Sequence, residues 1–309
     1  MEKIETQYNI NFKGYENYKD IILDIFENDN INYNLTDDII LIILGLYYKY
    51  KIKNYNEMEK YYLMAVEYGN SFAMVSLSFY YFIERNYDKM KKYCLMAIEL
   101  NNSDAMYNLA RYYSIVEQNY DKMKKYHLMA IKLNNVEAMY SLADYYQCVE
   151  QNYDEMIKYY LMAIELNDSN SMNNLGCYYQ DTYNYDEMKK YYLMAIKLNN
   201  SNSMNNLGCY YCDIKNYDEM KKYYLMGIKI NDNLCLKHLC EFCKKEIQHY
   251  LLKPINSKIA IEKVKELETN NFLGITILKD LTEYVFNPKR LLRLCNIYGI
   301  ELDDYMDTI

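Results

Sequence analysis

A five-residue motif, Asn-Tyr-Asp-Lys/Glu-Met, returns through most of the chain at a nearly constant spacing. Its tyrosine stands at Tyr87, Tyr120, Tyr153, Tyr185 and Tyr217, and a weaker first copy, in which Asn56 replaces the aspartate, has Tyr55. The steps between these tyrosines are 32 or 33 residues. A period of this length is typical of arrays in which each unit buries its apolar side against the next one. The motif therefore predicts a repeat array over residues 37–243.

Each unit predicts two helices. The stretch that follows the motif carries apolar residues on one helical face, here called helix B: Met188, Tyr192, Ala195 and Ile196. An asparagine-rich break over 199–202 suits a helix end and a new N-cap. The next apolar face, helix A, is formed by Met204, Leu207, Gly208 and Tyr211. The array is thus expected to be a series of helix-turn-helix pairs.

Small residues recur at one position of each helix. In helix A this column is Gly45, Ser78, Ala110, Ala143, Gly176, Gly208 and Cys240. In helix B it is Ala65, Ala97, Ala130, Ala163, Ala195 and Gly227. Glycine inside a helix costs about 1 kcal/mol against alanine, so its return indicates close packing. The two columns are expected to meet where the A and B helices of a pair cross.

Composition and charge exclude several classes of function. Only 2 prolines and 8 glycines are present, which favours helices over strands and turns. Lys plus Arg number 35 against 43 Asp plus Glu, so the net charge of −8 argues against binding to nucleic acid. The longest apolar run, 39–46, is far shorter than the roughly 20 residues that span a bilayer, so no membrane partner is expected.

The nine cysteines and the acidic first segment indicate in which cellular compartment the protein is located. Residues 1–6 lack the basic start and apolar stretch of a secretory signal. Cysteines in such a chain are expected to stay reduced, since thiol buffers keep them so in the cytosol. The sequence therefore predicts a cytoplasmic protein.

The repeat resembles the Sel1-like and tetratricopeptide families. Their signature positions are matched by Met172, Leu175, Gly176, Tyr179, Met188, Tyr192 and Ala195. The step of 12 residues from the helix B alanine to the next helix A leucine is similar to Sel1, whereas the short turn from A to B is similar to tetratricopeptide repeats. The resemblance implies an all-α fold, an α-α superhelix or solenoid of tandem helix-turn-helix repeats, serving as a non-enzymatic scaffold. The bias toward Asn, Tyr, Ile and Lys is similar to arrays of giant DNA viruses, which would place the protein in the host cytoplasm.

The two ends differ from the array. Residues 1–36 include an apolar pattern over 15–30 that predicts an opening, capping helix. Beyond Cys243 the repeat stops, Pro254 breaks the chain, and three helices are predicted within 257–298. Residues 244–309 are expected to be a helical cap, with a small separate binding module as the alternative.

Most residues that could bind a metal or take part in catalysis are better explained by a structural role. Two Cys-x-x-Cys pairs, at 209–212 and 240–243, have the composition of a zinc site, but the repeat register places them on different sides of equivalent helices. His127 occupies a column that holds tyrosine at Tyr62, Tyr160, Tyr192 and Tyr224, so a packed histidine is expected. No catalytic motif, metal site or cofactor site is predicted.

The inner, concave face of the A helices holds peptides in the resembled families, so we expect a peptide-binding groove there. Its lining is predicted to be Tyr107, Asn108, Arg111, Tyr140, Ser141, Asp144, Asn173, Asn174, Cys177, Gln180, Asn205, Asn206, Cys209, Lys237, His238 and Glu241. Asparagine amides can donate to and accept from a peptide main chain at once. Three alternatives stay open: that the asparagines reflect genome bias, that the protein assembles with itself through tyrosine-rich outer faces, or that Cys209, Cys212 and His238 form a metal or enzyme centre.

Overall fold

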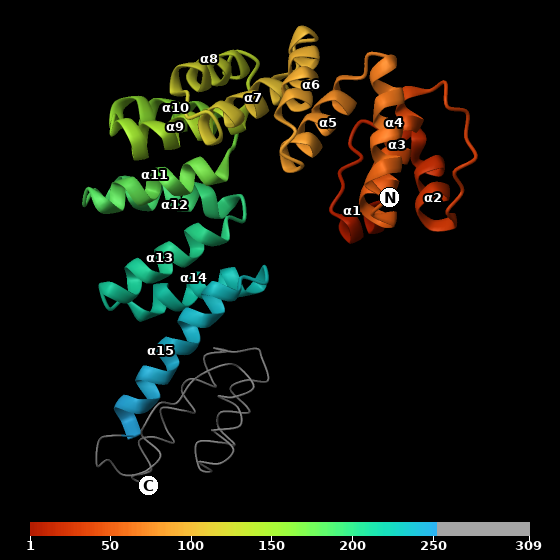
Figure 1. Cartoon of the computed structure of the whole chain (residues 1–309). Coiled ribbons are helices and arrows are strands. Elements are labelled where there is room, and N and C mark those ends of the chain that lie inside the picture. The colour runs from red at the N-terminus through yellow and green to blue at the C-terminus, as the bar shows by residue number, and fades with distance from the viewer. Residues whose placement is uncertain (252–309) are drawn as a thin grey trace, which may run out of the picture. The chain divides into compact units, whose positions relative to one another are not determined.

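A computed structural model describes residues 1–251, with side chains up to residue 242 (Figure 1). Every regular element in this part of the chain is helical, as predicted. The expected cap or module over 244–309 lies outside the described residues from 252 onward, as do the three helices predicted within it.

The repeat array consists of alternating A and B helices, as the motif predicts. The A helices are α3 (Asp38–Tyr47), α5 (Ser71–Ile83), α7 (Ser103–Ile115), α9 (Val136–Tyr145), α11 (Ser169–Asp181), α13 (Ser201–Asp213) and α15 (Asn233–Leu251). The B helices are α4 (Tyr55–Glu67), α6 (Tyr87–Glu99), α8 (Tyr120–Ile131), α10 (Tyr153–Glu165), α12 (Tyr185–Lys197) and α14 (Tyr217–Lys229). Helices α3 and α9 end in single π-type turns, η2 (Tyr48–Ile52) and η3 (Tyr146–Glu150). Helix α15 runs past Cys243, where the sequence repeat stops.

The chain forms two compact units, Met1–Asn206 and a second that begins at Leu207. The first contains the N-terminal segment, helices α3 to α12 and the start of α13. The described part of the second contains the end of α13, α14 and α15. The two units are described separately below.

Capping explains why helices begin where they do. The motif asparagine precedes each B helix, and its side chain accepts a backbone N–H of the first turn; Asn152, for example, accepts from Glu155 at 3.2 Å. A second asparagine or aspartate does the same for the A helices, as Asp168 does for Ser171 at 2.7 Å. The aspartate that follows the motif tyrosine lies in the first turn, where negative charge favours the helix dipole. The motif is therefore a helix start signal.

Left-handed residues close the turns. Asn101, Asn134, Asn167, Asn199 and Asn231 have positive φ between a B helix and the next A helix. Asparagine tolerates this conformation better than most side chains. In the turns from A to B the same conformation falls on residues of other types, such as Tyr183 with φ 59°.

The N-terminal segment is more structured than predicted. Besides the expected helix, observed as η1 (Glu16–Tyr18) and α2 (Lys19–Asn28), a short helix α1 (Glu2–Tyr8) precedes it. Phe12 between them is completely buried. The edge-to-face contact of the Phe12 and Phe26 rings, with centroids 5.7 Å apart, joins this segment to α2. Phe26 in turn contacts Tyr47 of α3, so the segment packs on the first repeat.

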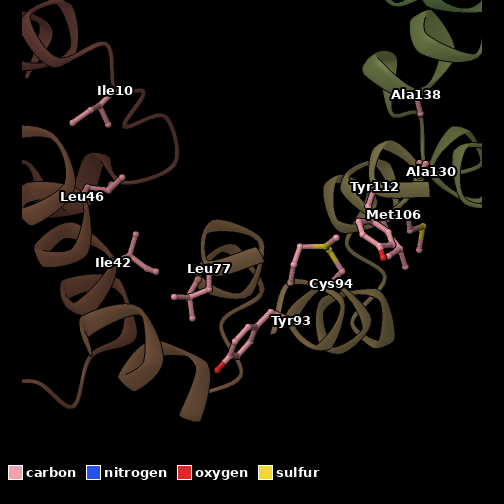
Figure 2. Close-up of a cluster of buried hydrophobic side chains, with 14 of the residues drawn as sticks. Ile10, Ile42, Leu46, Leu77, Tyr93, Cys94, Met106, Tyr112, Ala130 and Ala138 are labelled. Atoms are coloured by element: carbon pink, nitrogen blue, oxygen red, sulfur yellow. The ribbon is translucent and has the colours of Figure 1, made fainter. Parts of the chain in front are cut away.

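A continuous apolar core runs through the first unit, with side chains from successive helices (Figure 2). The predicted faces are buried: Met188, Tyr192, Ala195 and Ile196 of α12 are all less than a tenth exposed. His127 is packed as predicted, with 2% of its surface exposed. The core therefore has the composition that the repeat pattern predicts.

The two small-residue columns do not meet each other, which corrects the prediction. A β-carbon placed on Gly176 of α11 would lie 2.6 Å from ring carbons of Tyr192, not against Ala195. The small residue Gly227 of α14 instead faces the following helix α15, where a β-carbon on it would overlap Sγ of Cys235. Each column of small residues thus accommodates a larger side chain from a different neighbour.

Tyrosine stacking accounts for much of the unusual tyrosine content. In every hairpin a tyrosine near the end of helix A stacks on one in helix B, as in Tyr146 on Tyr159 with centroids 5.7 Å apart and 4° between planes. The same geometry recurs for Tyr113 with Tyr126 and for Tyr211 with Tyr223. Such pairs contribute roughly 0.5–1.5 kcal/mol beyond buried area. These tyrosines are engaged within the array.

Candidate functional site

Successive A helices of the first unit lie side by side. The side-chain amide of Asn102 donates to Ser71 Oγ at 3.2 Å, that of Asn135 to Asp104 Oδ1 at 2.9 Å, and that of Asn200 to Ser169 Oγ at 3.2 Å. In each case a cap residue of one A helix contacts the start of the preceding A helix. The A helices therefore share a surface, which we call the A face.

The predicted groove residues of this unit lie on the A face, most of them half-buried. Asn173 and Asn205 are exceptions, since only 8% and 6% of their surfaces are exposed. Asn173 Oδ1 accepts from Ser203 Oγ at 2.9 Å and from Asn206 Nδ2 at 3.2 Å. Asn173 therefore joins repeats rather than offering an open amide, and binding of a peptide main chain by the remaining groove residues stays a prediction.

The amide of Asn174 links three elements. Its Nδ2 donates to the hydroxyl of Tyr140 on α9 at 2.9 Å and to that of Tyr160 on α10 at 3.1 Å. Tyr160 donates in turn to Asp144 and to Gln147. Burial raises the pKa of the Asp144 carboxyl, although the hydrogen bonds from Tyr160 and Asn174 act in the opposite direction.

The next hairpin repeats this arrangement with other atoms. Tyr192 of α12 donates to Gln180 Oε1 at 2.9 Å and to Cys177 Sγ at 3.3 Å, both on α11. Asn206 also donates to Cys177 Sγ, at 3.4 Å. Burial raises the pKa of the Cys177 thiol, so it stays protonated at neutral pH and is a weak nucleophile. The polar residues here hold the A face in shape.

Asn108, Ser141 and Arg111 differ from these residues. Within the described part of the chain, none of the three side chains makes a hydrogen bond or an ion pair. The guanidinium of Arg111 lies between two rings, with Cζ 6.0 Å from the centroid of Phe82 and 5.7 Å from that of Tyr107. Tyr107 also contacts the buried ring of His127. Sequence reasoning placed Arg111 and Tyr107 on this face but missed Phe82.

In the second unit, the remaining predicted residues lie on α13 and α15. His238 Nδ1 is 3.7 Å from Cys209 Sγ, which also accepts from the Tyr224 hydroxyl at 3.3 Å. Lys237 and Glu241 are exposed and form an ion pair at 4.0 Å. No group of three or more His, Cys, Asp or Glu side chains that could hold a metal ion occurs among the described residues. The histidine and the cysteine make a polar contact between repeats.

No helix in the described part of the chain is long and apolar enough to span a bilayer. No protein-family model matches the sequence. No curated protein matches it either.

Solved structures match the fold. A Sel1 repeat protein from Oxalobacter formigenes is 18% identical, with a TM-score of 0.56 over 71% of this chain and 97% of that one. A protective antigen of uropathogenic Escherichia coli with an SLR fold is 17% identical, with a TM-score of 0.54 over 85% of this chain and 60% of the antigen. Human IFIT1, solved as a dimer with PPP-AAAA, is 18% identical, with a TM-score of 0.52 over 92% of this chain and 69% of that one. The chain thus has an all-α solenoid fold of tandem helix-turn-helix repeats, similar to Sel1-repeat structures.

Proposed function

We propose that the protein is a non-enzymatic scaffold that binds a segment of a partner protein along its A face. The observation that carries this proposal is Arg111, a guanidinium held between Phe82 and Tyr107 with no acidic partner in the described part of the chain. In a protein of net charge −8, an unpaired arginine on a shared surface is a ready site for an acidic ligand group. Arginine and aromatic residues also dominate the energetics of protein interfaces.

The hydrogen-bonded neighbours support the same function. Asn174 and Asn206 connect adjacent A helices, so the surface is ordered before a partner arrives. A preordered surface loses less conformational entropy on binding, which raises affinity. The polar network is therefore best understood as support for binding.

The fold is compatible with this proposal and with other binding functions. The human structure of similar fold was solved with PPP-AAAA. For the present chain the acidic net charge favours a protein partner over a nucleic acid. We also propose a cytoplasmic location, in the host cytoplasm for a chain of giant-virus type, since the described cysteines are free thiols.

Site-specific photo-crosslinking tests the proposal. A benzophenone amino acid at Ser141, on the A face, is expected to capture a partner in cell extract. The same group at Asp121, exposed on helix α8, is the matched control and is expected to capture much less. Equal capture from both positions, or none from Ser141, would contradict binding along the A face.

Exposed leucines favour self-assembly as a second function. Leu95, Leu128, Leu161 and Leu193 recur on the B helices, each between 38% and 47% exposed. The tyrosines that stack within the hairpins are mostly buried, whereas the motif tyrosines Tyr120 and Tyr153 on the B helices remain 38% and 45% exposed. Sedimentation velocity across a concentration series tests this function, with Leu128→Ser plus Leu161→Ser as the comparison. A monomer at all concentrations would exclude it.

A further inference from the structure

One hairpin lacks the aromatic side chain that fills the others. At the helix B position that faces the small residue of helix A, four hairpins carry tyrosine: Tyr62, Tyr160, Tyr192 and Tyr224. In hairpin α5–α6 this position is Cys94, which is buried and lies near Ser78. Cys94 and Leu77 are both labelled among the buried side chains of the core in Figure 2. A thiol occupies far less space than a phenol ring, so this hairpin has room that the others do not.

A shallow depression lies at the surface of this hairpin beside α7, with an empty volume of about 220 Å³ that includes open solvent. It is lined by Ser78, Phe79, Phe82, Met90, Asn108 and Arg111. Phe79 and Phe82 occupy the repeat positions of Asp144 on α9 and Gln147 in η3, which accept hydrogen bonds from the Tyr160 hydroxyl. Hairpin α5–α6 therefore has apolar residues where hairpin α9–α10 has polar ones, and it also lacks the tyrosine that these polar residues would contact.

The rim of the pocket carries two polar groups from the next A helix. Asn108 occupies the repeat position of Asn174, and Arg111 that of Cys177, but neither has the hydrogen bonds that its counterpart makes. Arginine presents parallel N–H groups that fit a carboxylate, and stacking on aromatic rings limits its loss of freedom on binding. An apolar recess beside an unpaired arginine matches an apolar and an acidic group carried on one ligand.

We propose that this pocket, on α5, α6 and α7, binds a protein segment in which an apolar side chain stands next to an aspartate or glutamate. The apolar side chain enters the recess between Phe79 and Phe82, and the carboxylate accepts hydrogen bonds from Arg111. The proposal rests on the function proposed above and names the chemistry of the partner. Because the A face continues on both sides of α5 and α7, the segment passes through the pocket with internal residues rather than a chain end.

An array of peptides with blocked termini tests this proposal on the full-length protein. Each peptide carries one apolar residue followed by Asp, Glu, Asn or Gln, within randomised flanks. Wild-type protein is expected to select leucine, isoleucine, methionine or phenylalanine beside an acid, and to bind the amide counterparts at least about tenfold more weakly. Binding is expected to weaken as salt rises, since a partly exposed ion pair is screened.

Two variants separate the pocket from the rest of the A face. Arg111→Gln is expected to remove the preference for acids, whereas Arg85→Gln, an exposed arginine in a turn, is the matched control and keeps it. Ser78→Gly plus Cys94→Tyr recreates the pairing of Gly176 with Tyr192 and is expected to fill the recess and remove the apolar preference. Far-UV circular dichroism checks that each variant is folded, and Arg111→Gln tests the proposal independently of changes in the core.

The possible results distinguish this inference from the broader function. Selected peptides that bind equally to wild type, Arg111→Gln and the filled variant would overturn the pocket while leaving the A face as a binding surface. Selection by the wild-type protein of peptides that lack an apolar residue next to an acid would also overturn the pocket and leave the A face as a binding surface. Failure of wild type to bind any peptide, together with no crosslinking at Ser141, would contradict both proposals.

Discussion

Gly176 of α11 lies directly against the ring of Tyr192 of α12, so close that a β-carbon on Gly176 would be 2.6 Å from ring carbons Cδ1 and Cε1. Gly45 with Tyr62 and Gly208 with Tyr224 repeat this pairing. Hairpin α5–α6 has Ser78 beside Cys94 instead. Where helix A has glycine, helix B has its largest residue, and where helix A has serine, helix B has a small one. In α5–α6 both residues are small, so this pair does not fill the space that the tyrosine ring occupies beside glycine in the other hairpins.

Gly176→Leu is expected to destabilise the array by about 3 kcal/mol, because the new side chain has no space beside Tyr192. Thermal denaturation followed by circular dichroism measures the effect. Asn202→Leu, at an exposed position of the neighbouring A helix, is the control and is expected to change stability by less than about 0.5 kcal/mol. Equal stability of Gly176→Leu and wild type would contradict the observed packing.

A compensating substitution provides a sharper test of the same pairing. Adding Tyr192→Cys to Gly176→Leu reduces the volume on helix B and is expected to recover part of the loss. The coupling energy in this double-mutant cycle is expected to exceed about 1 kcal/mol, since the two residues are in contact. Strict additivity of the two single effects would show that they do not share one space.

The helical array could be predicted because its signals repeat. The spacing of Tyr87, Tyr120 and Tyr153 gave the register, and the buried positions followed from the 3.6-residue period. The partners of the small residues could not be derived in the same way. A column such as Gly176 shows that something approaches closely, but periodicity alone does not tell whether Tyr192 or Ala195 is the neighbour.

The polar part of the site was harder to predict for a related reason. Asn174 and Arg111 both lie on the A face, yet the first is hydrogen-bonded to adjacent tyrosines and the second is not. One sequence signal was available for the pocket: the tyrosine column changes to Cys94 where the A helix gains Phe79 and Phe82. Its meaning depends on side-chain volumes across two helices, which composition does not reveal.

His127 is expected to make stability depend on pH between about 4 and 6.5. Its ring is buried against Tyr107, its Nδ1 has no hydrogen-bond partner among the residues that the structure describes, and burial lowers its pKa to about 4. The unfolded chain takes up the proton near pH 6.5. Unfolding therefore binds a proton in this window, so lowering the pH from 7 to 5 is expected to cost about 2 kcal/mol of stability at this residue.

His127→Tyr is the matched variant for this pH effect, because Tyr160 already pairs with an alanine, Ala143, at the equivalent position. Tyrosine does not titrate between pH 5 and 7, so the variant is expected to lose less stability over that range than wild type. Urea denaturation at pH 7, 6 and 5 measures the difference. Parallel losses in both proteins would show that His127 is accessible to protons in the folded state.

Asn135 is expected to contribute more than an ordinary cap. Its Oδ1 accepts the N–H of Ala138 at 2.8 Å, and its Nδ2 donates to Asp104 at 2.9 Å on the preceding A helix. Asn135→Asp retains the cap but places a second carboxylate beside Asp104, so a loss of about 1 kcal/mol at neutral pH is expected. At position 168 an aspartate already caps α11, and Asp168→Asn is the control. An Asn135→Asp variant as stable as wild type would show that Asn135 contributes to stability only as a helix cap.

Tyr183 and Gly69 are expected to respond to substitution in opposite directions. Both have positive φ, 59° and 77°, in turns between helices. A β-carbon is unfavourable in this conformation, by roughly 1 kcal/mol. Tyr183→Gly removes that cost from an exposed side chain and is expected to stabilise by about 0.5 kcal/mol, since the unfolded chain also gains freedom. Gly69→Ala has open space around it and is expected to destabilise by about 1 kcal/mol through backbone conformation alone. Thermal denaturation of the two variants measures both effects, and shifts of the same sign would show that backbone strain does not set the stability of these turns.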